Sequence, residues 1–274
     1  MTAISAYSKA ENQTQSISLN RLAINFGFSI GPLSGGFIAG HYGYEMLFYL
    51  DGVTYILAGV LILMLLKNVA VERQEEDDPS KPISSKSSPY ADKAFMVNMF
   101  LTFLLALGFL QLFTTVPPFW KENISLPEQK IGLLFAINGI HLAIFEVPVI
   151  HYLEKRFHLF HLIAIGTLLI GGAFTLFGMG QSFSIMVAAM IVASFGEMIS
   201  LPFTATVALI FSKPTTRGQY MSVYGFSWSG AHLIGPAMGM SIAAQWRFQS
   251  AFWVFAMVTA AAALGFALFN RHKD

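Results

Sequence analysis

Eight long apolar stretches constrain this chain more than any other feature of its sequence. Each is long enough to cross about 30 Å of hydrocarbon as a helix that rises 1.5 Å per residue. Within a bilayer, backbone polar groups must be paired inside helices or a closed barrel, and these stretches are too long for barrel strands. We therefore predict an all-α membrane protein of about eight transmembrane helices. The predicted helices span residues 22–39, 46–66, 94–117, 131–151, 160–180, 183–211, 219–244 and 249–270.

The composition agrees with a membrane protein and excludes several functional classes. Hydrophobic residues make up 55% of the chain and charged residues 11%, whereas soluble domains carry about 25% charged residues. Sixteen basic residues balance 15 acidic ones, so charge gives no reason to expect a nucleic-acid partner. The sequence contains no cysteine, which excludes disulfides, thiolate metal sites and cysteine nucleophiles. We expect the lipid bilayer as a partner, and neither a cofactor nor a metal.

One connection between the predicted helices differs from the others. Residues 67–93 are charged, rich in serine and punctuated by proline, a composition that cannot bury apolar area. We predict a cytoplasmic linker there, which divides the chain into residues 1–66 with two helices and residues 94–274 with six. With the linker inside, 13 of the 16 Lys and Arg residues lie on the cytoplasmic side and three lie outside. This bias predicts that both termini are cytoplasmic.

The chain also repeats itself. When it is shifted by 204 residues, Ile30-Gly31-Pro32 meets Ile234-Gly235-Pro236, and Gly35 meets Gly239. The pair of helices before the linker therefore matches the last pair of the chain. Because an even number of helices separates the two copies, they run in the same direction, so we predict two parallel, related halves.

Residues Gly27 to Gly36 read G-x-x-x-G-P-x-x-G-G. This pattern resembles the antiporter motif in the fifth helix of drug:proton antiporters of the major facilitator superfamily. The stretches 18–25, 47–52 and 196–198 also resemble bacterial members of that group. The resemblance implies a partial major facilitator fold, made of the last two helices of the N-terminal half plus the six-helix C-terminal half. It also implies N-terminal helices missing from this chain, four of them before Met1.

The glycine motif also has a direct physical interpretation. Glycines three and four residues apart allow two helices to approach closely, and a central proline permits a kink. In the family this helix is thought to lie at the seam between the halves and to limit proton leak. The alternative is a tight helix contact with no further role. The residues of the antiporter-like motif are Gly27, Gly31, Pro32, Gly35 and Gly36. For the degenerate later copy, residues 231–239, we favour a plain helix contact.

Ionisable residues at membrane depth are costly, and they are functional candidates for that reason. Glu197, near the middle of the 183–211 helix, is the first candidate for a protonatable or substrate-facing group. The alternative is a protonated carboxyl paired with a neighbouring helix. For Glu146, just before Pro148, a functional and a structural role are equally open. Further candidates for proton coupling or the substrate cavity are His141, Asn138, Gln111, Trp228 and His232.

The resemblance implies secondary transport, with a small-molecule substrate and protons as partners. The expected activity is proton-coupled efflux of a small amphipathic compound by alternating access, in a bacterial inner membrane. An enzyme is not expected, because the sequence has no H-E-x-x-H or G-x-S-x-G motif. A truncated or non-transporting membrane scaffold or sensor stays open as the alternative.

Overall fold

The computed structural model describes residues 13–65, 88–213 and 216–269. Every predicted stretch forms a long helix in it, so the predicted all-α fold with about eight helices is confirmed. The long helices are α2 (Gln13–Tyr42), α3 (Tyr44–Leu65), α4 (Lys93–Thr114), α6 (Glu128–Leu153), α7 (Leu159–Met179), α8 (Phe183–Phe211), α9 (Arg217–Gln245) and α10 (Phe248–Phe269). Among the described helices, six are long and apolar enough to cross a membrane. The other two long ones, α2 and α9, are diluted by glycine, serine and amide residues.

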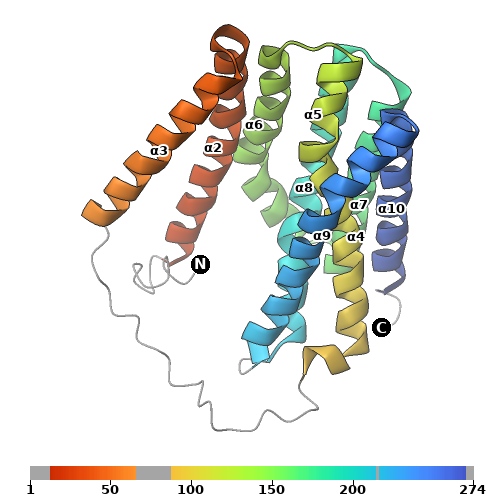
Figure 1. Cartoon of the computed structure of the whole chain (residues 1–274). Helices are drawn as coiled ribbons and strands as arrows, with labels where there is room; N and C mark the ends of the chain where they lie inside the picture. Colours follow the sequence, from red (N-terminus) through yellow and green to blue (C-terminus); the bar gives the residue numbers. More distant parts are fainter. Residues whose placement is uncertain (1–12, 66–87, 214–215, 270–274) are drawn as a thin grey trace. The chain divides into compact units, whose positions relative to one another are not determined.

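The helices fall into two compact units. The first contains α2, α3 and the beginning of α6, as far as Ala143. The helices α2 and α3 form an antiparallel hairpin (Figure 1). Gly43 alone links them, and its φ of +82° is one that glycine adopts without strain. None of the described residues of α3 is buried within the structure.

The sequence repeat extends to the helix boundaries. Shifted by 204 residues, Tyr44, the first residue of α3, becomes Phe248, the first residue of α10. The same shift carries Tyr42, the last residue of α2, to within one residue of Gln245, the last residue of α9. It also carries Gly43 onto Arg247, which again links two helices and again has a positive φ, of 150°. The two helix pairs are therefore two copies of one hairpin.

The second unit is a bundle of α4 and α7–α10, together with the end of α6. Helix α7 packs against both α8 and α10, while α4 packs against α9 and α10 (Figure 1). A short helix, α5 (Val116–Pro118), and a π-helical turn (Phe119–Asn123) extend α4. Fully buried aromatic rings fill the bundle, and Phe119 meets Phe252 edge to face at 4.9 Å between ring centroids. The abundance of phenylalanine thus serves packing as well as lipid contact.

The end of the predicted linker is structured. Residues 66–87 lie outside the described part of the chain, but Pro89–Ala91 form a 3₁₀ turn. Asp92 then caps α4, because its side chain accepts a hydrogen bond of 3.0 Å from the backbone N–H of Phe95. A carboxylate at this position satisfies a backbone donor that the helix itself leaves unpaired. A short turn and the cap of α4 therefore form the last residues of the predicted linker.

Candidate functional site

The antiporter-like motif forms a close helix crossing within the first unit. A methyl group added to Gly36 of α2 would overlap the carbonyl oxygen of Glu128 and would lie 3.1 Å from Cα of Gly132 in α6. Conversely, a methyl group on Gly132 would overlap the carbonyl oxygen of Pro32. The two backbones therefore touch directly, an approach that only glycine at both positions permits.

A second glycine of α6 supports the same crossing. A methyl group on Gly139 would lie 2.6 Å from Oγ of Ser29 and 2.8 Å from its Cα. Gly132 and Gly139 were not predicted from the sequence, although their spacing of seven residues places both on one face of a helix. That spacing is the signal that would have identified the partner face of the motif.

The five residues of the motif are not equivalent. Among the described residues, no atom lies within 4 Å of a methyl group added to Gly27 or Gly31. At Gly35 the nearest atom, Cδ2 of Leu47, is 3.9 Å away. Of the motif glycines, Gly36 therefore carries the contact with α6, while Gly35 borders an open space.

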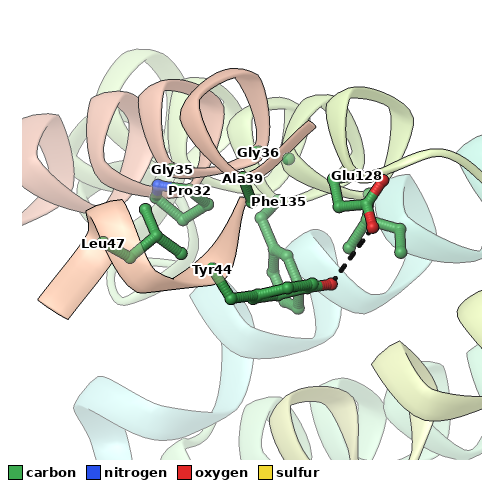
Figure 2. A pocket seen from close by; sticks show the side chains of 10 residues that line it. Pro32, Gly35, Gly36, Ala39, Tyr44, Leu47, Glu128 and Phe135 are labelled. Atoms are coloured by element: carbon green, nitrogen blue, oxygen red, sulfur yellow. Dashed lines mark hydrogen bonds between the residues drawn. The ribbon is translucent and has the colours of Figure 1, made fainter. Parts of the chain in front are cut away.

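That space is a cavity of about 200 Å³ beside the crossing. It is lined by residues from α2, α3 and the first part of α6. Figure 2 shows Tyr44 pointing toward Glu128, and the Tyr44 hydroxyl donates a hydrogen bond of 3.3 Å to the Glu128 carboxylate. The lining residues are Pro32, Gly35, Gly36, Ala39, Tyr44, Leu47, Glu128, Ile131, Gly132 and Phe135.

The strongest predicted candidate, Glu197, lies in the second unit. It is the middle residue of α8, which has 29 residues, and it is half-buried. The residue before it, Gly196, packs against α7, since an added methyl group would lie 2.7 Å from the carbonyl oxygen of Gly166. In turn, a methyl group added to Gly166 would lie 2.7 Å from the Gly196 carbonyl oxygen and 2.7 Å from Ser200. This backbone contact fixes α8 on α7, and it therefore fixes the position of Glu197 along the length of the bundle.

Three other predicted residues lie on α6. Glu146 is half-buried, ahead of Pro148, which interrupts the hydrogen bonding of the helix. Asn138 is 2% exposed. His141 is half-buried, and its Nδ1 lies 2.8 Å from the carbonyl oxygen of Ile137, one turn back on the same helix. Because a carbonyl oxygen only accepts, Nδ1 carries the hydrogen in this contact.

Gln111 links two helices of the second unit. It is fully buried in α4, and its Nε2 donates to the carbonyl oxygen of Gly235 in α9 at 3.1 Å. Its Oε1 accepts a bond of 2.5 Å from the hydroxyl of Thr115. A methyl group on Gly239 would overlap both Gln111 and Thr115. The later copy of the glycine motif is thus a helix contact, as favoured from the sequence.

Trp228 and His232 lie one turn apart on α9. Nδ1 of the exposed His232 lies 3.0 Å from the Trp228 carbonyl oxygen. The ring of Trp228 meets that of Phe109 edge to face, and its Nε1–H is buried with no hydrogen-bond partner among the described residues. The buried amide of Asn98 in α4 is in the same situation. An unpaired buried polar group destabilises a fold by about 1–3 kcal/mol.

The two buried amides of α4 give opposite predictions. Gln111→Leu is expected to lower the free energy of unfolding by about 1–3 kcal/mol, because buried groups of α9 and Thr115 lose their partner. Asn98→Leu is expected to raise it by about 1 kcal/mol, because an unpaired amide is replaced by an apolar side chain of similar size. Unfolding of the detergent-solubilised protein, followed by tryptophan fluorescence, measures both. Equal destabilisation by the two variants would show that the Asn98 amide is paired.

Comparison with known proteins identifies the family. A sequence profile of the Major Facilitator Superfamily matches residues 1–160 and 99–274, which together cover the whole chain. The all-helical fold, the apolar spans and the repeated hairpin describe a helical membrane protein built from a duplicated unit. The chain belongs to the Major Facilitator Superfamily.

Similar proteins of known sequence are transporters. The uncharacterized MFS-type transporter MJ1560 of Methanocaldococcus jannaschii is 24% identical over 222 residues, which cover 78% of this chain and 55% of that protein. A Na(+), Li(+), K(+)/H(+) antiporter of Planococcus maritimus is 23% identical over 238 residues, covering 78% and 56%. The chain spans about half the length of the curated relatives it matches.

A solved structure shows the same fold. The crystal structure of a POT family transporter in complex with 5-aminolevulinic acid superposes with a TM-score of 0.70 at 14% identity. The match covers 99% of this chain and 72% of that one. At this identity the likeness concerns the fold alone.

Proposed function

We propose that the protein is a secondary transporter that exports a small amphipathic compound in exchange for protons, by alternating access. The observation that carries the proposal is the position of Glu197. A helix of 29 residues is about 43 Å long, so its middle residue lies near the centre of a hydrocarbon layer of about 30 Å. An ionisable residue at that depth is a functional candidate by default, because its charge is costly there.

The surroundings of Glu197 support a proton-carrying role. Gly196 holds one face of α8 against α7, and Glu197 projects about 100° away from that face. Pro202, one turn beyond, removes the backbone hydrogen bond that the carbonyl of Met198 would otherwise accept. Helix α8 is thus held against α7 on both sides of Glu197, at Gly196 and Ser200, and is able to bend at Pro202. In the proposed cycle, Glu197 alternates between a protonated and an ionised form as α8 bends, and Glu146 on α6 is the second proton site.

The crossing of α2 and α6 supports the proposed alternating access. At Gly36 and Gly132 it is made by backbone atoms, and one turn further along α2 the side chain of Gln129 packs against Gly40. The backbone part of this contact can separate and meet again without rearranging rotamers, which suits a seam that opens once in each cycle. By resemblance, the antiporter-like motif at this seam limits proton leak. Proton exchange is also consistent with the Planococcus maritimus relative, which is a Na(+), Li(+), K(+)/H(+) antiporter.

Charge placement supports the proposed topology. With the 67–93 linker inside, 13 basic residues face the cytoplasm and three face outward, and an even number of helices leaves both termini cytoplasmic. We propose the bacterial inner membrane as the location, on the resemblance to bacterial antiporters. In this topology the cavity beside Gly36 lies toward the outer surface, because α3 begins and α6 begins on that side.

Transport in everted membrane vesicles tests the proposal. Vesicles containing the complete protein are energised, and accumulation of a fluorescent amphipathic compound is followed with and without a pH gradient. Glu197→Gln is expected to abolish the dependence on the gradient, because an amide cannot bind and release a proton. Glu146→Gln is expected to weaken it. The matched control is Glu122→Gln, which neutralises an exposed carboxylate of the π-helical turn and is expected to leave transport unchanged.

Two outcomes contradict the proposal in different ways. If the double variant with Gln at positions 146 and 197 keeps gradient-driven export, the proton sites are wrong. If the wild-type protein shows no saturable flux of any tested compound, the alternative of a non-transporting membrane scaffold or sensor is favoured.

A further inference from the structure

The cavity between α2, α3 and α6 takes no part in the proton-transfer scheme above, yet its walls have a distinct chemistry. One end is polar, where Tyr44 donates to Glu128 (Figure 2). The rest is apolar and is formed by aliphatic and aromatic side chains and by glycine backbone. The apolar side chains are those of Pro32, Ala39, Leu47, Ile131 and Phe135.

The residues that line the cavity carry charge of one sign only. Glu128 is a carboxylate at its rim, and none of the ten described residues that line the cavity carries a positive charge. Two aromatic rings, those of Tyr44 and Phe135, also line the cavity. A carboxylate together with aromatic faces is the chemistry that attracts organic cations.

The volume limits the size of a ligand. About 200 Å³ is smaller than the roughly 300–1,000 Å³ of pockets that hold drug-sized molecules. The absence of a side chain at Gly35 leaves part of this space open. A side chain at Gly35 would enter it, since the nearest atom to an added methyl group there is 3.9 Å away and belongs to the cavity wall.

From this combination we infer that the cavity binds a small organic cation with an apolar body, such as a quaternary or protonated amine. The cationic nitrogen lies next to the Glu128 carboxylate and against the rings of Tyr44 and Phe135. The apolar body lies along Pro32, Leu47 and Ile131. The Tyr44 hydroxyl holds the carboxylate in place from the side.

Binding at this site has a structural consequence. The ligand touches three helices at once, so it stabilises the arrangement in which α2 and α6 are in contact, by mass action. The site does not depend on the proposed transport, because binding is measured without a gradient and the proton-carrying candidates lie elsewhere. A failure here would leave the proposed function standing, and the reverse also holds.

Equilibrium dialysis of the detergent-solubilised full chain against radiolabelled benzyltrimethylammonium tests the inference. Benzyl alcohol serves as the uncharged comparison. We expect saturable binding of the cation and much weaker binding of the alcohol. Glu128→Gln is expected to weaken cation binding about tenfold, through loss of the charge partner. Its matched control is Glu45→Gln, an exposed carboxylate next to Tyr44 that does not line the cavity, which is expected to bind as the wild type does.

A second pair of variants tests the space rather than the charge. Gly35→Leu is expected to fill the cavity and to abolish binding. Gly31→Leu places the same side chain one turn away, outside the cavity, and is expected to keep binding. Circular dichroism and thermal unfolding show that each variant is folded. The inference is overturned if the wild type binds no cation, if benzyl alcohol binds as tightly, or if the Glu45 and Gly31 variants lose binding as much as their partners.

Discussion

Gly36→Val is expected to separate α2 from α6, whereas Gly31→Val, five residues earlier on the same helix, is expected to leave them in contact. The added side chain at Gly36 would meet two backbone atoms of α6, the Glu128 carbonyl oxygen and Cα of Gly132. Backbone atoms cannot move aside as the end of a side chain can. Overpacking of this kind costs about 1–3 kcal/mol, which shifts the ratio of closed to open contact about 5- to 150-fold. At Gly31 no described atom lies within 4 Å of the added group.

The chain suits a cross-linking measurement because it contains no native cysteine. Tyr44→Cys combined with Glu128→Cys places thiols on α3 and α6 at positions whose side chains touch in the structure. A short bifunctional maleimide is expected to join them in the otherwise native protein and in the Gly31→Val background. The yield is expected to fall several-fold in the Gly36→Val background. Equal yields in both backgrounds would show that Gly36 does not hold the crossing.

Gly166→Val is expected to destabilise the second unit strongly, because it drives α7 and α8 apart. Its side chain would collide with the Gly196 carbonyl and with Ser200, both of which approach within 2.7 Å of the added methyl group. We expect a loss of about 1–3 kcal/mol in unfolding free energy. We also expect loss of proton coupling, because Glu197 follows Gly196 directly.

Thermal unfolding in detergent measures the first effect, and the vesicle assay measures the second. The matched control is Gly172→Val on the same helix, where the nearest atom to an added methyl group, Cγ1 of Val192, is at an ordinary 3.9 Å. If the two valine variants melt at the same temperature, the crossing at Gly166 and Gly196 is not a fixed point of the bundle.

The sequence alone predicted the helices well, because hydrophobic length is a local property. The 183–211 prediction coincides with the observed bounds of α8, and the 204-residue repeat predicted that the hairpin of α3 has a counterpart in α10. Helix α2 is longer than its predicted 22–39, since polar residues at its ends do not interrupt helical hydrogen bonding. The apolar stretch in the sequence is therefore shorter than the helix that contains it.

The candidate site was harder to predict, for two physical reasons. Tyr44 and Glu128 lie just outside the predicted stretches 46–66 and 131–151, so a search for ionisable residues at membrane depth passed over them. Which glycine makes a contact depends on the facing helix and not on the motif. Gly35 and its repeat counterpart Gly239 illustrate this: the first borders a cavity, and the second is packed against Gln111.

The repeated hairpin has a consequence for how the protein enters the membrane. Helices α2 and α9 are the two long described helices that do not qualify as spans by length and composition. Each is joined by a very short turn to a strongly apolar helix, α3 or α10, which does qualify. Because the free energy of insertion sums over the residues that enter together, the apolar helix offsets the cost of its polar neighbour. We expect each pair to leave the translocon as one helical hairpin, so that a polar substitution in α3 or α10 also keeps α2 or α9 out of the bilayer.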